Sequence, residues 1–182
     1  MKRYSAVCIL MALAAASPAT LGAQSAALSI GSASPTWEAW RGSFSGFVTR
    51  GDLVWREPNH FLYWRASGSF TRLGGGMGAS GDRLPPAQIY GLSASAVLSP
   101  SVYIVRMPPA LAHVAYVAAG PGLYGYRSLT EYRLGWHLGA GLQAPVGEWT
   151  LFGEAMGTVL GSNASTTGFP GMLRSVSIGI RR

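Results

Sequence analysis

The chain has 182 residues, of which 48% are hydrophobic and 12% are charged, and this balance excludes an ordinary disordered protein. Its formal net charge of +7 falls to +5 without Lys2 and Arg3, and the remaining basic residues are scattered arginines, without the clustering that nucleic-acid binding needs. The 25 glycines follow no Gly-X-Y period, which excludes collagen, and they disfavour helices because glycine costs about 1 kcal/mol there relative to alanine.

The first 23 residues have the three parts of a secretory signal peptide. A basic start at residues 2–3 precedes an apolar stretch at 5–16, and small residues follow before a cleavage site after Ala23. The apolar stretch is too short for a transmembrane helix, which needs about 20 residues. We therefore expect a cleaved signal peptide at 1–23 and one domain at 24–182, which contains no cysteine.

Alternating apolar and polar residues, separated by glycine- and proline-rich breakers, then predict a series of β-strands. Eight strands are expected, at 26–33, 41–52, 60–72, 87–99, 111–126, 131–144, 148–159 and 172–181. An even number of strands is typical of outer-membrane barrels, and eight strands leave an interior that side chains can fill.

The alternation is clearest between Glu131 and Ala144. Every second residue from Tyr132 onward is apolar or aromatic, whereas the residues between them, which include Arg133 and His137, contain no large apolar side chain. Alternation over such a length exceeds the five or six residues of an average strand. It suits a tilted membrane strand, which needs about 9–11 residues.

The composition of the two strand faces favours a membrane barrel over a soluble one. The polar face consists mainly of glycine, serine and threonine, which suit a narrow lumen better than a surface in water. The apolar face carries four aromatic residues that we expect at the lipid or its interface, namely Trp64, Tyr90, Tyr132 and Trp136. The sequence predicts an all-β, antiparallel up-and-down transmembrane β-barrel; a soluble lipocalin-like barrel and a β-sandwich are the alternatives.

Four glycine-rich segments follow one another in the second half of the chain, at Tyr116–Tyr126, Leu138–Leu142, Leu151–Ala155 and Val176–Arg181. In order and spacing they resemble the late strands of the opacity-protein and OmpA-like family of small outer-membrane β-barrels. The resemblance covers residues 116–181. It implies a location in the outer membrane of a Gram-negative-type bacterium.

The last strand also resembles the C-terminal signal that is read by the barrel assembly machinery. Val176, Ile178 and Ile180 occupy the seventh, fifth and third places from the end of the sequence, as that signal requires. Such strands usually end in Phe or Trp, and this sequence departs from the pattern because it ends in Arg181 and Arg182.

Charged residues at inward strand positions predict a polar network in the lumen. Its expected members are Glu131, Arg133, His137, Glu154 and Arg65. Because a buried charge without a partner is costly, inward carboxylates need inward arginines. The sequence predicts no metal site, since its three histidines lack a metal-binding spacing.

The segment Gly120–Gly125 matches the dinucleotide pattern G-x-G-x-x-G. A dinucleotide site needs this loop to open a helix, whereas here the segment contains a proline and leads into a strand. Its glycines are better explained as places where a strand bends or where a large lumen side chain fits opposite.

Three functions remain open at this point. The first is a structural or surface-interaction barrel with a filled lumen, the second a narrow channel or transporter, and the third a lipid-modifying enzyme. The sequence shows no Ser–His pair or nucleophile elbow, so we expect no catalysis and no cofactor. The expected partners are outer-membrane lipid including lipopolysaccharide, whose phosphates suit arginine, the assembly machinery and other envelope proteins, but not nucleic acid.

Overall fold

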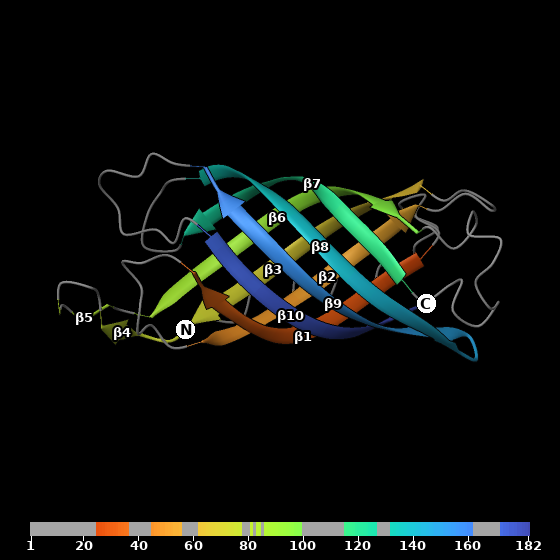
Figure 1. The fold of residues 1–182 in the computed structure, drawn as a ribbon, viewed down its shortest axis with the longest axis horizontal. Coiled ribbons are helices and arrows are strands. Elements are labelled where there is room, and N and C mark those ends of the chain that lie inside the picture. Colours follow the sequence, from red (N-terminus) through yellow and green to blue (C-terminus); the bar gives the residue numbers. More distant parts are fainter. Residues whose placement is uncertain are drawn as a thin grey trace, which may run out of the picture.

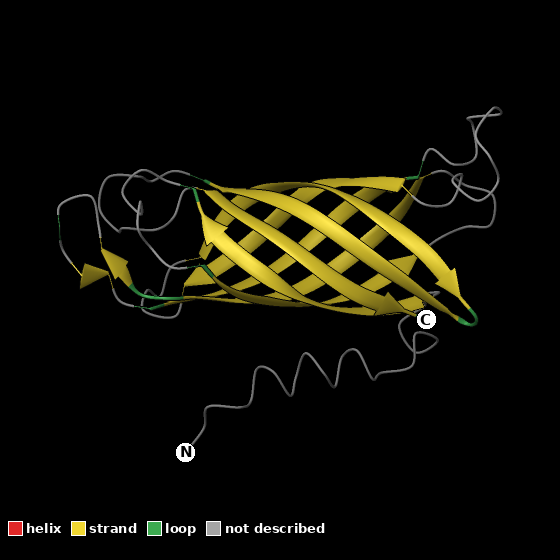
Figure 2. Ribbon diagram, turned by 60° about the horizontal axis from the view of Figure 1, so that its bottom comes forward, coloured by secondary structure: helices red, strands yellow, loops and turns green. Residues whose placement is uncertain are grey.

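The computed structural model describes residues 25–36, 45–55, 62–77, 81, 83–84, 86–99, 115–126, 132–161 and 172–182. Eight antiparallel strands of this part of the chain close into a barrel, and Figures 1 and 2 show them crossing the barrel wall obliquely. The predicted eight-stranded antiparallel barrel is thereby confirmed. Within the described residues, no helix is long and apolar enough to cross a membrane.

The barrel strands lie close to their expected positions. They are β1 (Ser25–Pro35), β2 (Gly46–Trp55), β3 (Leu62–Leu73), β6 (Ala87–Leu98), β7 (Ala115–Tyr126), β8 (Tyr132–Val146), β9 (Trp149–Leu160) and β10 (Met172–Arg181). The largest difference concerns β2, which begins at Gly46 instead of the expected residue 41 and continues three residues beyond its expected end at residue 52. A further pair of short strands, β4 (Gly76–Met77) and β5 (Arg83–Leu84), was not predicted because its glycines and prolines indicated only a turn.

The two ends of the barrel differ. The hairpin end is the one where β4 and β5 form a small sheet in the connection between β3 and β6. The turn end carries the two-residue turn Gly147–Glu148 between β8 and β9, together with Ser25 and Arg182. Gly147 has a φ of +62°, in the left-handed region that glycine adopts at little cost.

Pairing of the first and last barrel strands closes the sheet. At the turn end, Ala26 and Arg182 exchange two backbone hydrogen bonds of 2.9 and 3.0 Å. All other neighbours in the barrel follow one another along the chain, apart from the small β4–β5 sheet, so the topology is up-and-down. Closure pairs every barrel strand on both sides and leaves no open edge.

The side chains of β8 alternate as the sequence predicted. Leu134 and Leu138 point outward and are 72% and 66% exposed, whereas His137 and Gln143 point into the lumen and are 3% and 5% exposed. The apolar face of the strand is therefore the outer face of the barrel. This arrangement is the reverse of that in a soluble barrel, which buries its apolar face.

Candidate functional site

The middle of the lumen contains a charged layer built around Glu154 of β9. One carboxylate oxygen of Glu154 accepts a hydrogen bond from Arg50 of β2 at 2.5 Å, and the other accepts one from Arg65 of β3 at 2.6 Å. All three residues are at most 8% exposed. Strands that are far apart in the sequence thus meet across the lumen through one carboxylate.

Asp52 and Tyr116 complete this layer. The Arg50 Nε lies 3.1 Å from the nearer Asp52 carboxylate oxygen, and the Tyr116 hydroxyl donates a hydrogen bond of 2.8 Å to Glu154. The layer, defined as Arg50, Asp52, Arg65, Tyr116 and Glu154, contains two guanidinium groups and two carboxylates. Its formal charges therefore cancel, as buried charges must if they are not to be strongly destabilising.

A glycine allows Tyr116 to reach Glu154. Tyr116 of β7, Gly141 of β8 and Glu154 of β9 lie opposite one another in the strand register. A Cβ atom on Gly141 would overlap the phenol ring of Tyr116. The bare backbone of Gly141 therefore provides the space across which the tyrosine hydroxyl reaches the carboxylate on the far strand.

The same arrangement brings Ser95 and His137 together. Ser95 of β6, Gly120 of β7 and His137 of β8 lie in one row, because Gly120 is opposite His137 and the β6–β7 register brings it opposite Ser95. The Ser95 Oγ and the His137 Nε2 are 2.7 Å apart. The His137 Nδ1 is buried and has no hydrogen-bond partner among the described residues.

Within the described part of the chain, this Ser–His pair has no third group of the kind that orients a catalytic histidine. Ser95 and His137 are 1% and 3% exposed, so the pair lies inside the lumen instead of at a rim where a lipid substrate could reach it. A catalytic histidine is normally oriented by a third group on its other nitrogen, and no described carboxylate contacts the Nδ1 of His137. The geometry accounts for the pair as a buried hydrogen bond.

Apolar side chains close the lumen on both sides of the charged layer. The cluster at the hairpin end consists of Ala33, Val48, Leu73, Ala87, Ile89, Tyr124, Leu160 and Leu173. The cluster at the turn end consists of Val54, Tyr63, Val97, Ala118 and the ring of Tyr116, whose hydroxyl belongs to the charged layer. The lumen is thus filled in three layers, with charges in the middle and apolar groups toward each end.

Among the described residues, two small cavities lie in the lumen. One, of about 50 Å³, lies on the hairpin side of the charged layer and is lined by Ser29 and Arg50 among others. The other, of about 20 Å³, lies on the turn side beside Asp52 and Arg65. A water molecule needs roughly 10–15 Å³ of such volume, so these cavities suit a few waters and are too small for a larger solute.

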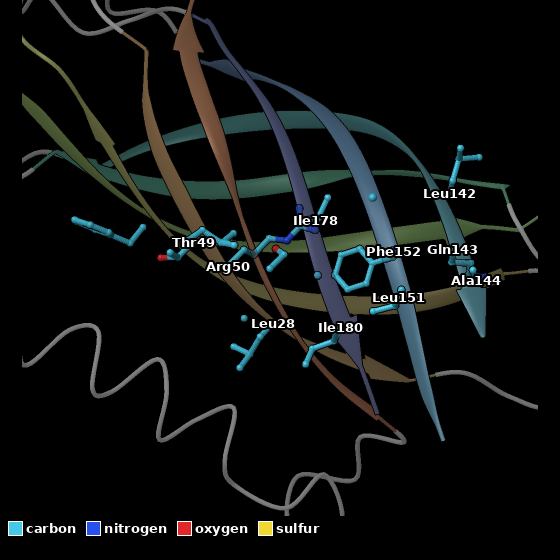
Figure 3. A pocket seen from close by; sticks show the side chains of 16 residues that line it. Leu28, Thr49, Arg50, Leu142, Gln143, Ala144, Leu151, Phe152, Ile178 and Ile180 are labelled. Carbon is cyan, nitrogen blue, oxygen red and sulfur yellow. The ribbon is translucent and has the colours of Figure 1, made fainter. Parts of the chain in front are cut away.

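The outer wall is apolar over most of its height. Trp64, Tyr132 and Trp136 are 59%, 72% and 67% exposed on this wall, and Tyr90 is half-buried against Phe70, with a ring separation of 5.2 Å. The wall also holds a hollow of about 790 Å³ that is lined by the outward residues Leu28, Leu151 and Ile180 (Figure 3). Its lining also includes the inward residues Arg50, Gln143 and Phe152.

The last strand contributes both to the wall and to the turn end. Val176, Ile178 and Ile180 point outward and are 60%, 69% and 43% exposed. Arg181 donates a hydrogen bond of 2.8 Å to Gln143. Arg182 pairs with Glu148 at 3.1 Å and lies over the ring of Trp149 at 5.5 Å, so its side chain rests on the neighbouring hairpin.

The structure brings together only some of the residues that the sequence suggested for the lumen. Arg65 and Glu154 are ion-paired, whereas His137 contacts Ser95 and Arg133 is half-buried near the hairpin end. Glu131 lies outside the described residues, as do the proposed signal peptide and the other two histidines.

The sequence analysis missed several residues of the lumen, namely Arg50, Asp52, Ser95 and Tyr116. A signal for the first two was present, since they stand two residues apart and therefore share one strand face. No comparable signal marked Ser95, because serines are frequent at inward positions throughout this chain.

No protein-family model and no curated protein sequence matches this chain. Among solved structures, Neisserial surface protein A (NspA) is similar, with a TM-score of 0.58 and 16% identity over 86% of this chain and 94% of that one. The outer membrane enzyme PagL matches with a TM-score of 0.48 and 14% identity over 86% of this chain and 97% of its own. The Yersinia pestis outer membrane protein Ail matches with a TM-score of 0.47 and 17% identity over 87% and 99%.

The similarity to NspA concerns the fold, because the identity is low while nearly the whole of both chains is covered. It agrees with the up-and-down topology of eight strands and with the apolar outer wall. The chain therefore has the fold of the small outer-membrane β-barrels, as its resemblance to the opacity-protein and OmpA-like family predicted.

Proposed function

We propose that this protein is an outer-membrane barrel with a sealed lumen that acts through its outer surface, as a structural or surface-interaction protein. The observation that carries the proposal is the three-layered filling of the lumen. The central layer holds Glu154 between Arg50 and Arg65, and an apolar cluster lies on either side of it. Because the interior is filled in this way, interactions with other molecules would take place at the outer wall and at the two ends of the barrel.

The chemistry of the outer wall supports insertion into a membrane. Large apolar side chains such as Leu92, Trp136 and Ile178 are more than 65% exposed on different strands. Soluble monomers rarely expose apolar surface of this extent. In lipid the same surface is favourable, and a closed barrel also satisfies the backbone hydrogen bonds that lipid cannot.

The route to the membrane belongs to the same proposal. Residues 1–23 would direct export, and the outward residues Val176, Ile178 and Ile180 of the last strand would be read by the barrel assembly machinery. The final location would be the outer membrane of a Gram-negative-type bacterium, where lipid, including lipopolysaccharide, and other envelope proteins are the available partners.

The observations support the two other functions less well. A channel would require a path past Glu154, where the two small cavities are separated by ion-paired side chains. A lipid-modifying enzyme would require substrate to reach Ser95 and His137, both of which are buried in the lumen. We therefore propose a non-catalytic, non-conducting barrel.

Membrane fractionation with heat modifiability tests the membrane part of this proposal. We expect the protein in the outer-membrane fraction, with a different gel mobility before and after boiling, because a folded barrel resists unfolding by detergent. A fully soluble periplasmic product would contradict the proposal.

Planar-bilayer recording then tests the sealed lumen. We expect no discrete conductance steps from the folded protein. Stable steps would instead favour the narrow channel.

A further inference from the structure

Two arginines interrupt the apolar outer wall at the hairpin end of the barrel. Arg72, near the end of β3, and Arg174, near the start of β10, both point outward and are exposed. Apart from Arg182 at the turn end, they are the only charged residues on the outer wall of the described barrel strands. An arginine on this face destabilises the folded barrel if it lies in hydrocarbon. The depth of these two arginines in the membrane and the groups that neutralise their charge therefore need an explanation.

The neighbouring aromatic residues indicate the depth of Arg72. Phe47, Phe70 and Tyr90 form a row of ring contacts on three adjacent strands, with centroid separations of 5.8 and 5.2 Å. Such aromatic girdles mark the membrane interface in outer-membrane barrels. Arg72 is the next outward residue after Phe70 toward the hairpin end, about 7 Å farther along the strand. Its guanidinium group therefore reaches the level of the lipid headgroups.

The described part of the chain supplies no counter-charge for these two arginines. Its three acidic side chains are those of Asp52 and Glu154 in the lumen and Glu148 in the turn at the opposite end, where the C-terminal carboxylate also lies. Neither Arg72 nor Arg174 takes part in any ion pair within the described residues. At headgroup level the abundant anions are lipid phosphates, and a planar guanidinium group suits their geometry.

The spacing of the two arginines indicates the kind of lipid. β2 and β1 separate β3 from β10, so three inter-strand spacings, about 14 Å, lie between the backbones of Arg72 and Arg174. The strand register adds two residues, about 7 Å along the strand, because Arg72 lies in one row with Val176. Ser34, directly opposite Arg174, and Ser32, two residues earlier on β1, point outward between them. With both side chains extended, a headgroup with phosphates at its two ends matches this separation, whereas a single phosphate serves both guanidinium groups only if the two side chains converge on it.

We propose that Arg72 and Arg174, with Ser32 and Ser34 between them, bind a glycolipid whose sugar headgroup carries two phosphates, one at each guanidinium group. This inference rests on the proposed membrane location and assigns the hairpin end to the leaflet that contains such a glycolipid.

Native mass spectrometry of the folded full barrel with bisphosphorylated lipid A tests the proposal. The variant R72Q/R174Q should bind about 25-fold more weakly than the parent and each single variant about fivefold more weakly, since each arginine near a charged lipid surface contributes about 1 kcal/mol. Monophosphorylated lipid A should bind the parent protein about fivefold more weakly than bisphosphorylated lipid A does. On one of the single variants, the loss of that phosphate should weaken binding no further. R83Q, which removes an exposed arginine of β5 at the same end, is the matched control and should bind like the parent.

Several results would overturn the proposal. They are full binding by R72Q/R174Q, an equal loss in R83Q, equal binding of a phospholipid with one phosphate, and displacement of the lipid by inorganic phosphate. If the double variant does not fold, the proposal is still tested by comparing the binding of bisphosphorylated and monophosphorylated lipid A to the parent protein. A parent protein that becomes heat-modifiable in vesicles but shows no preference for the glycolipid refutes only this inference, whereas failure to insert refutes the proposed function.

Discussion

At the scale of single residues, Glu154 is the group on which the lumen depends most. Its carboxylate contacts two guanidinium groups and one hydroxyl, and it is 2% exposed. Neutralising it leaves Arg50 and Arg65 in the lumen with Asp52 as their remaining partner in the layer. Removal of one partner from a buried ion pair is much more damaging than removal of an exposed one, because the uncompensated charge stays buried.

We therefore predict that E154Q lowers the free energy of unfolding by about 3–5 kcal/mol. Urea unfolding of the protein in lipid vesicles, followed by tryptophan fluorescence, measures this quantity. E148Q is the control, because Glu148 is exposed at the turn end and its loss should leave the midpoint unchanged. Equal unfolding midpoints for E154Q and the parent protein would show that the charged layer does not stabilise the barrel.

Gly141 gives a second test at this scale. In G141A the new methyl group meets the ring of Tyr116 and pushes it from Glu154, so we predict a loss of about 1–3 kcal/mol in unfolding free energy. G153A is the matched control, because a Cβ there meets its nearest atom at 3.9 Å and alanine is favoured over glycine within a strand. The same urea titration measures the unfolding midpoints of G141A and G153A. Similar midpoints for the two variants would contradict the role given to Gly141.

The sequence revealed only part of this residue-level arrangement, for a physical reason. Charged residues within a clean alternation, such as Glu154, could be assigned to the inner face. On β2, however, Val48 and Val54 share the inner face with Arg50 and Asp52, so apolar and charged residues appear on one side and the period-two signal weakens. Tyr116 was missed because a tyrosine on an apolar strand gives no sign that its hydroxyl is needed inside.

At the scale of the elements, the accuracy of the strand assignment follows the contrast between the two faces. β8 has large apolar groups outside and small or polar groups inside, and its expected limits differ from the observed ones by at most two residues. β2 ends in the apolar run Leu53-Val54-Trp55, where both faces are apolar, and its end was placed too early. The β4–β5 pair has almost no pattern to detect, since each strand has two residues.

The orientation of β8 leads to a prediction for the element as a whole. Leu138 lies near the middle of the strand, points outward and is 66% exposed. L138R should lower the unfolding free energy in vesicles by about 2–4 kcal/mol, because an arginine is then held near the middle of the hydrocarbon layer. L138A is the control for the lost side-chain volume and should cost less. If L138R is as stable as L138A, this face does not contact lipid.

At the scale of the whole molecule, the barrel is a closed ring of antiparallel pairs in which the position of the chain ends is arbitrary. The sequence established this ring through strand number and alternation alone, because neighbours along the chain are neighbours in the sheet. It revealed only part of how the interior is filled, since contacts such as Arg50 with Glu154 join residues 104 positions apart and depend on the stagger of every intervening strand.

A circular permutant tests whether the ring, and not the order of synthesis, determines the fold. Ala26 and Arg182 exchange backbone hydrogen bonds, so a short glycine–serine linker can join the two ends while the turn between Gly147 and Glu148 is opened. The new and old ends lie at the same end of the barrel, and every barrel strand keeps both of its partners. We predict that this permutant, refolded in vesicles, remains heat-modifiable and cooperative in urea, with a somewhat lower midpoint.

A deletion of β10 provides the contrasting variant. Its removal exposes β1 and β9 as two unpaired edges, whose backbone groups have no hydrogen-bond partners in lipid. We predict that this variant gives no heat-modifiable band under conditions in which the permutant does. A permutant that fails to fold, or a deletion that folds as well as the parent protein, would show that closure between β1 and β10 is not what holds the barrel together.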